Sequence, residues 1–147
     1  MTLLARLQDE VKSAMRAREK ERLATLRLIM ADIKRIEVDE RVEMDDDRIV
    51  GVLTRMAKQR RDSIEQYRNG GRDDLADKEA AEIGIIEAFL PEQLDGDELD
   101  AAVAAAIAEV GAVSMRDMGK VMGKLQGELA GKADIAAVAA AVKQKLA

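Results

Sequence analysis

Residues 58–94 read KQRRDSIEQYRNGGRDDLADKEAAEIGIIEAFLPEQL. Asn69, Gly70 and Gly71 separate two segments in which apolar residues recur at helical spacing. Glycine readily takes the left-handed conformation that follows a helix end. Pro91 cannot continue the second segment, because it has no backbone N–H and its ring clashes with the preceding turn. This stretch therefore predicts a helical hairpin, with one helix that ends at Asn69 and another over about 73–90.

Arg60 interrupts the apolar stripe of the first helix of this hairpin, between Met56 and Ile64. Glu79 and Glu82 fall close to the stripe of the second helix. An antiparallel hairpin that turns at the two glycines brings these glutamates level with Arg60. One interpretation is an interior ion pair that sets the register of the two helices. The other is that the long side chain of Arg60 carries its charge out of the core to solvent.

Two more amphipathic helices are predicted before the hairpin, over about 2–18 and 21–39. Each has apolar residues on one side only, so each needs a packing partner. Asp45, Asp46 and Asp47 open the next helix, where carboxylates accept hydrogen bonds from free amides and suit the positive end of the helix dipole. A magnesium site made of these oxygens is the alternative. Capping explains the same residues more simply, and we predict no metal site.

The composition changes after Pro91, where alanine becomes abundant. Helices are predicted over about 99–110 and 134–146, and Ser114 is expected to cap a short helix that begins at Met115. We therefore predict an all-α chain with a four-helix bundle-like domain and a small three-helix domain. The expected boundaries are 1–91 for the first domain, 92–96 for a linker and 97–147 for the second domain.

Composition restricts the classes of protein that this chain can belong to. Of its 147 residues, 48% are hydrophobic but only 1% are aromatic, so the core must be aliphatic. No stretch resembles a signal peptide or a membrane span, and no cysteine is present for a disulfide. We therefore expect a cytoplasmic protein with no membrane partner. The formal net charge is −5, so any contact with nucleic acid has to come from a local basic surface.

Catalytic chemistry has few candidate residues. Histidine and cysteine are both absent, which removes the commonest general base, the thiol nucleophile and the usual ligands of soft metals. No phosphate-binding loop or dinucleotide fingerprint appears. Carboxylates alternate with lysine and arginine, as on a solvated helix face. We predict no catalytic residue and no cofactor.

The most unusual pattern lies in MGKVMGKLQGELAGKAD, residues 118–134. Glycine recurs at every fourth position, and each glycine inside a helix costs about 1 kcal/mol relative to alanine. One interpretation is close packing against another helix, the usual purpose of a small-residue stripe and the one that spacing alone favours. The other is close approach of a nucleic-acid backbone. The glycines are Gly119, Gly123, Gly127 and Gly131, and the lysines that would face phosphates are Lys120, Lys124, Lys132, Lys143 and Lys145.

A second basic cluster lies on the helices of the hairpin. It consists of Arg55, Lys58, Arg61, Arg68 and Arg72, with Arg60 on the apolar side. Interleaved carboxylates offset much of its charge, so a solvated face is the simpler interpretation. Tyr67 and Phe89 are the only rings, and both fall on apolar stripes. A base-stacking platform is therefore excluded, and any RNA must be recognised by its shape and backbone.

Three stretches together resemble the YqeY family: residues 58–94, residues 118–134, and LRLIMADIKRIEVDE at residues 26–40. That family is related to the C-terminal part of the B subunit of the glutamine-dependent aspartyl/glutamyl-tRNA amidotransferase. The resemblance implies an all-helical fold with a bundle followed by a small domain. It also implies a connection to tRNA, because this tail helps hold tRNA in the amidotransferase while amidation occurs in other domains. The RNA-facing candidates implied by the resemblance are Gly119, Lys120, Gly123, Lys124, Gly131 and Lys132.

Three functions are therefore considered. The first is a tRNA-binding accessory module that acts on tRNA, or on an aminoacyl-tRNA synthetase or amidotransferase complex, without catalysing a reaction itself. The second is a protein-interaction module whose glycine-lined groove receives a partner helix. The third is a component of a carbon–nitrogen ligase that uses glutamine as amide donor. It ranks last, because no residue in the sequence is suited to generate ammonia or activate a carboxylate.

Overall fold

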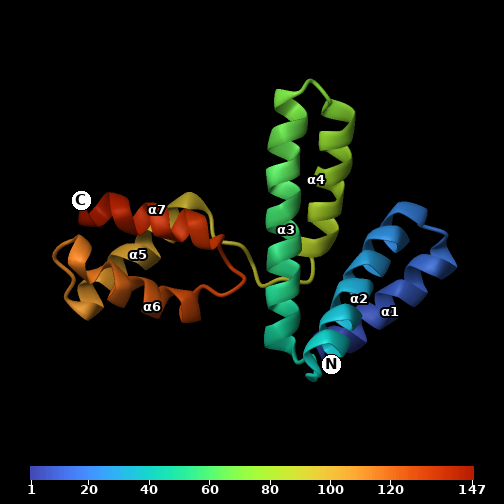
Figure 1. The fold of residues 1–147 in the computed structure, drawn as a ribbon, viewed down its shortest axis with the longest axis horizontal. Coiled ribbons are helices and arrows are strands. Elements are labelled where there is room, and N and C mark those ends of the chain that lie inside the picture. Colours follow the sequence, from blue (N-terminus) through green and yellow to red (C-terminus); the bar gives the residue numbers. More distant parts are fainter. The chain divides into compact units, whose positions relative to one another are not determined.

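A computed structural model describes residues 1–147 as seven α-helices and one short 3-10 helix, with no strand (Figure 1). The prediction of an all-α chain is therefore confirmed. The helices fall into two compact units, Met1–Leu90 and Pro91–Ala147. No helix in either unit combines the length and the apolar character that crossing a membrane requires.

The first unit consists of two helical hairpins (Figure 1). The bounds of its helices are α1 Leu3–Ala17, α2 Lys20–Glu40, α3 Asp46–Asn69 and α4 Asp73–Glu87. Figure 1 shows that the outer part of the α3–α4 hairpin extends beyond the α1–α2 hairpin. Ile64 and Tyr67 were expected on an inward stripe but are only half-buried, because α4 is the only helix that covers that part of α3. The four helices thus pack together over part of their lengths.

A core that is aliphatic except for Phe89 joins the four helices where the two hairpins meet. The predicted stripes supply its large members, which are Leu7, Leu26, Ile29, Ile33, Ile49, Leu53, Met56, Ile86 and Phe89. Alanines that periodicity did not single out are buried as well, including Ala14, Ala57 and Ala76, and they leave room for close approach between helices. Met15 follows Leu7 and Val11 at helical spacing but is 52% exposed, because α1 at its last turn presents Ala14 to the core instead.

Helix α4 ends at Glu87, three residues earlier than expected. Pro91 disfavours helical backbone at Leu90 only. The helix ends earlier because its last turn tightens, with the amides of Phe89 and Leu90 donating to the carbonyls of Ile86 and Glu87 three residues back. This turn places Phe89 in the core at 3% exposure. The guanidinium of Arg6 lies 4.8 Å from the centroid of the Phe89 ring and donates to the carbonyl of Ala88 at 2.9 Å. The first turn of α1 is therefore attached to the end of α4.

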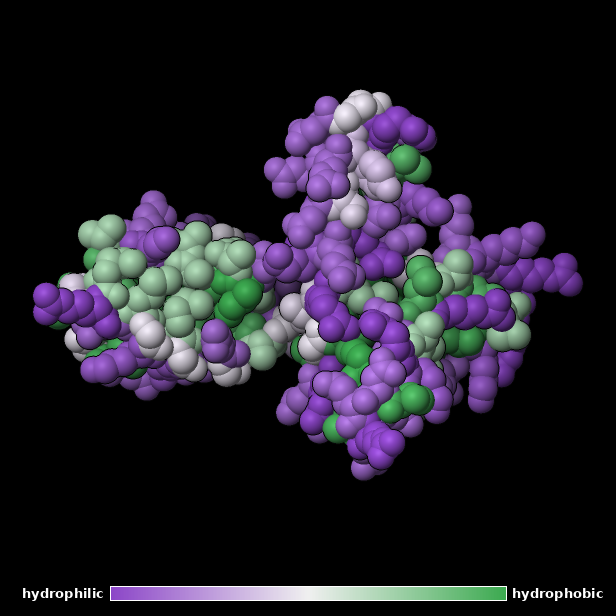
Figure 2. All heavy atoms as spheres, in the orientation of Figure 1, coloured by the Kyte–Doolittle hydropathy of each residue, from purple (hydrophilic) through white to green (hydrophobic).

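The second unit has its own small core. Its helices are α5 Gly96–Val110, the 3-10 helix η1 Met115–Asp117, α6 Met118–Glu128 and α7 Ile135–Leu146. Val103, Val121, Leu125, Val138 and Val142 are the centre of that core. Figure 2 shows the pale green of small apolar residues over this unit, consistent with the exposed alanines of its helices.

The segment after Pro91 packs on the second unit. The amide of Leu94 donates to the carbonyl of Lys132 at 2.9 Å, and the side-chain amide of Gln93 donates to the carbonyl of Gly131. Asp95 accepts from the amide of Glu98 and caps α5, which is why the helix begins at Gly96, inside the stretch expected to be a linker. Most of that stretch is therefore attached to the second unit.

Candidate nucleic-acid interface

Three of the four repeated glycines lie on an open face of α6. Gly119, Gly123 and Gly127 are exposed, and a Cβ atom added at any of them meets no neighbouring atom within 4 Å. The opposite face of α6 buries Val121 and Leu125 in the core of the second unit. No helix of the second unit therefore packs into the glycine stripe. The stripe is available to a ligand or to another molecule.

Gly131 has a different role from the other three glycines. It lies between α6 and α7, is buried, and has a backbone φ of +75°. Residues other than glycine rarely adopt that backbone conformation. Its carbonyl accepts the hydrogen bond from Gln93. Gly131 therefore makes the turn to α7 and holds the segment after Pro91, so it is not on an open surface.

Lys124 forms a bridge between α5 and α6. Its Nζ lies 2.8 Å from Oε2 of Glu109 and 2.8 Å from Oε1 of Glu128, and the side chain is 23% exposed. The hydrogen bond with Glu109, followed by the one with Glu128, raises the pKa of Lys124 above its usual value. Two carboxylates thus compensate this charge before any phosphate approaches. The sequence alone did not reveal this arrangement, because Glu109 lies on another helix.

The other candidate lysines are exposed and form no ion pair within the chain; they are Lys120, Lys132, Lys143 and Lys145. Figure 1 shows that α6 and α7 run in opposite directions, so the end of α7 lies beside the start of α6. Lys120 therefore shares one end of the unit with Lys143 and Lys145, whereas Lys132 lies in the loop at the other end. Helix α6 has 11 residues, which is a length of about 16 Å. The candidates are spread along the α6–α7 hairpin.

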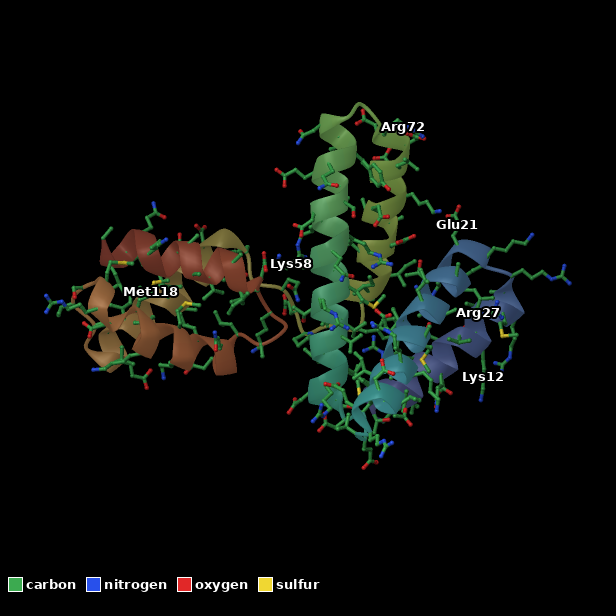
Figure 3. All side chains as sticks on the ribbon, in the orientation of Figure 1. Lys12, Glu21, Arg27, Lys58, Arg72 and Met118 are labelled. Carbon is green, nitrogen blue, oxygen red and sulfur yellow. The ribbon has the colours of Figure 1, made fainter.

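The second basic cluster is mostly paired with carboxylates. Its ion pairs are Lys58–Asp62 at 3.7 Å, Arg61–Glu87 at 3.7 Å, Arg68–Asp77 at 3.3 Å and Arg72–Asp74 at 3.2 Å. Arg72 is labelled in Figure 3 beside the α3–α4 turn. Its hydrogen bonds with Asp74 raise the pKa of the Arg72 guanidinium and lower the pKa of the Asp74 carboxyl. Arg55 is the one member with no ion pair. The pairing supports the interpretation of a solvated face.

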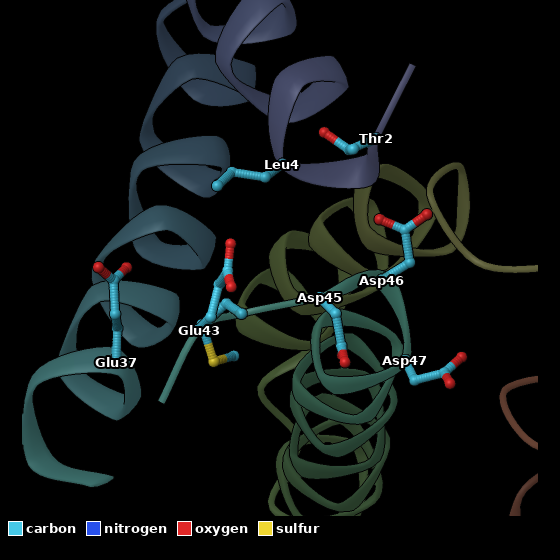
Figure 4. A pocket seen from close by; sticks show the side chains of 8 residues that line it. Thr2, Leu4, Glu37, Glu43, Asp45, Asp46 and Asp47 are labelled. Carbon is cyan, nitrogen blue, oxygen red and sulfur yellow. The ribbon is translucent and has the colours of Figure 1, made fainter. Parts of the chain in front are cut away.

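The aspartates at the start of α3 line a hollow of about 790 Å³ (Figure 4). Asp45 accepts from the amide of Arg48 at 2.9 Å, which confirms the predicted cap. Asp46 accepts from the amide of Leu3 at 2.9 Å and so joins the start of α1 to the start of α3. No three acidic side chains are arranged to hold a metal ion. Both carboxylates act on backbone amides at helix ends.

Comparison with known proteins gives a family match over nearly the whole chain. Residues 4–146 match the family model described as Yqey-like protein. Similar curated proteins are named altered inheritance of mitochondria protein 41, mitochondrial. The one from Eremothecium gossypii is 35% identical over 59% of this chain and 48% of its own length. The one from Pyrenophora tritici-repentis is 30% identical over 82% of this chain and 69% of its own length. The one from Meyerozyma guilliermondii is 37% identical over 57% of this chain and 44% of its own length. The chain thus matches about half the length of most of these relatives, whose names place them in mitochondria.

Proposed function

The chain belongs to the Yqey-like protein family, and we propose that it is a tRNA-binding accessory module that contacts the RNA backbone with helix α6. The open face made by Gly119, Gly123 and Gly127 supports this proposal. Without side chains on that face, a sugar-phosphate backbone can approach the helix within contact distance. Glycines inside a helix cost about 1 kcal/mol each, and packing within the second unit offers no compensation for them.

Phosphate contacts in this proposal come from the unpaired lysines. Lys120 lies one position after Gly119 on α6, and Lys143 and Lys145 lie at the same end of the unit. The second unit as a whole carries six basic and nine acidic residues, so net charge does not attract RNA to it. Five of those acidic residues lie within residues 92–100, which comprise the segment before α5 and the start of that helix. Binding therefore depends on a few local contacts, and about three neutralised phosphates would give a salt slope of about −3.

The module supplies binding in this proposal, and a partner enzyme supplies any chemistry. It would present tRNA to an aminoacyl-tRNA synthetase or an amidotransferase complex.

In the second candidate function, the same face receives a helix of a partner protein, because glycines allow two helix backbones to approach closely. The two functions differ in their dependence on salt, since only RNA binding releases counterions.

A fluorescence anisotropy titration of unfractionated tRNA at low and moderate salt tests the proposal. The variants are Lys120→Glu/Lys143→Glu and a control with the same change in charge, Arg48→Glu/Lys78→Glu, whose cations are exposed, unpaired and in the first unit. We expect salt-sensitive binding that the first variant loses and the control retains.

Binding lost equally in both variants would show non-specific attraction and contradict the proposal. No binding at low salt would also contradict it and would favour the partner-helix function. Gly123→Leu distinguishes a close contact with α6 from a purely electrostatic one, because it places a bulky side chain on the open face without removing a charge.

A further inference from the structure

The apolar stripes of α1 and α2 are partly exposed at their edges. On α1, Leu4, Gln8, Val11 and Met15 form a row with spacings of four, three and four residues. On α2 the same spacing joins Leu23, Arg27, Met30 and Lys34. The apolar members Leu4, Val11, Leu23 and Met30 pack against the core of the first unit but are only half-buried. Each row therefore follows the edge of a core-facing stripe and keeps part of its apolar surface exposed.

These two rows border a hollow of about 500 Å³ (the α1–α2 groove). Gln8, Val11 and Lys12 line it from α1, and Arg27 and Met30 line it from α2. Val11 and Met30 are half-buried, so each still exposes apolar surface in the groove. Met15 follows Val11 by one turn of α1 and is 52% exposed. Methionine is flexible and adapts its shape to different apolar partners. The floor of the groove is therefore suited to contact with apolar side chains.

The rim of the groove is cationic. Figure 3 labels Lys12 and Arg27, one from each helix of the hairpin, and both are exposed without an ion pair in the chain. Lys34 continues the α2 row and is 72% exposed, with only a 3.8 Å contact to Glu37 of its own helix. Cations that have no internal partner and flank an apolar floor are complementary to an apolar stripe bordered by carboxylates.

We propose that the α1–α2 groove binds an acidic amphipathic helix of a partner protein. The row from Leu4 to Met15 spans about 16 Å along α1, which matches about three turns of a helix. Apolar residues of the partner at three- and four-residue spacing would pack against Val11, Met15 and Met30. Aspartates or glutamates at the edges of that stripe would meet Lys12 and Arg27. The three helices would then pack side by side on the outer face of the hairpin.

The features of the groove favour this occupant over two others. RNA would pair with the cations but would leave the apolar floor without a matching surface. A second copy that docked through its own α1–α2 groove would bring Lys12 and Arg27 of the two copies together, and like charges that face each other are unfavourable. The proposal does not depend on RNA binding by α6, since the residues that carry it all lie in the first unit.

Labelled synthetic helical peptides test the proposal by anisotropy with the full chain. One peptide has leucines at three- and four-residue spacing with glutamates at the edges, the second has lysines in place of the glutamates, and the third is a shuffled version of the first. The protein variants are Lys12→Glu/Arg27→Glu and, with equal change in charge, Arg48→Glu/Lys78→Glu. Met15→Ser is compared with Leu28→Ser, which is 48% exposed on another face of α2. Circular dichroism confirms that each variant is folded.

We expect the acidic peptide to bind the wild type and to lose about tenfold in affinity with Lys12→Glu/Arg27→Glu, from two lost pairs and the new repulsion. The lysine peptide should bind that variant better than the wild type, and Met15→Ser should weaken binding more than Leu28→Ser. Equal binding by the shuffled peptide, equal loss in the control variant or no binding at all would overturn the proposal. So would loss of tRNA binding in Lys12→Glu/Arg27→Glu without any peptide binding, which would assign the groove to RNA. Variants of Lys120 should leave peptide binding unchanged.

Discussion

The Nε atom of Arg60 on α3 lies 2.8 Å from Oε2 of Glu82 on α4. Glu79, one turn earlier on α4, is 4.0 Å away, and a guanidinium nitrogen of Arg60 also donates to the carbonyl of Met56 at 3.3 Å. Arg60 is only 13% exposed and Glu82 only 17%. The interior ion pair predicted from the sequence is therefore confirmed, and the alternative, a solvent-directed Arg60, is wrong.

Removal of Arg60 alone should destabilise the first unit. Arg60→Met leaves Glu82 without its partner, and a poorly solvated group without its partner costs about 1–3 kcal/mol. The double variant Arg60→Met/Glu82→Leu removes both charges and should recover most of the free energy of unfolding. Urea unfolding followed by circular dichroism measures both. A double variant no more stable than Arg60→Met would show that the pair is not the reason for the loss.

Alanine at Gly123 should stabilise the second unit. An added Cβ meets no atom within 4 Å, and the helical backbone suits alanine better than glycine by about 1 kcal/mol. Thermal unfolding of Gly123→Ala measures the increase. A decrease in the midpoint would mean that another part of the molecule covers this face.

The same substitution at Gly131 should have the opposite effect. Its φ of +75° is unfavourable for alanine by about 1–2 kcal/mol, and its carbonyl positions Gln93. Gly131→Ala should therefore lower the unfolding midpoint, whereas Gly131→Asn should lower it less, because asparagine tolerates the left-handed region. Equal losses for the two variants would indicate that space, and not backbone conformation, is limiting at this turn.

Asp45 and Asp47 should differ in their contributions to stability although they are close in the sequence. Asp45 accepts from the amide of Arg48, so Asp45→Ala should cost about 1 kcal/mol, the usual cost of a lost cap. Asp47 accepts no such bond in the structure and only interacts with the helix dipole, so Asp47→Ala should cost about 0.5 kcal/mol or less. Urea unfolding compares the two variants, with Asp45→Ser as the control that retains a capping oxygen. A similar loss for both would contradict the assigned cap.

The pair of Arg72 and Asp74 predicts a small dependence of stability on acid pH. The hydrogen bond from Arg72 lowers the pKa of Asp74 below its usual 3.8. A group with a lowered pKa stabilises the fold above its unfolded pKa, and that contribution is lost as pH falls through the folded value. Carbon-13 NMR titration of the Asp74 carboxyl should give a pKa below 3.8 in the wild type and a higher one in Arg72→Ala. An identical titration in both proteins would contradict the pairing, and Arg55→Ala is the control.

Local patterns in the sequence predicted most elements of the fold. The caps at Asp45 and Ser114, and the turn after Asn69, depend on residues within about four positions of each other, so they can be predicted from the sequence. The ion pair of Arg60 could also be predicted, because helix periodicity and the position of one turn are enough to align two antiparallel helices. The early end of α4 was missed, because it depends on how Phe89 meets the core.

By itself, the amino-acid sequence determined that the chain is helical, where most helices begin and end, and which side of each is apolar, because helix hydrogen bonds and side-chain periodicity act over a few residues. Only the tertiary structure decided which of the candidate residues are free. It left three glycines of α6 open and buried Gly131, and it paired Lys124 with a glutamate from another helix while Lys120 stayed unpaired. It also left Val11 and Met30 partly exposed in the groove between α1 and α2. These outcomes depend on contacts between residues far apart in the chain, which no short pattern of residues specifies.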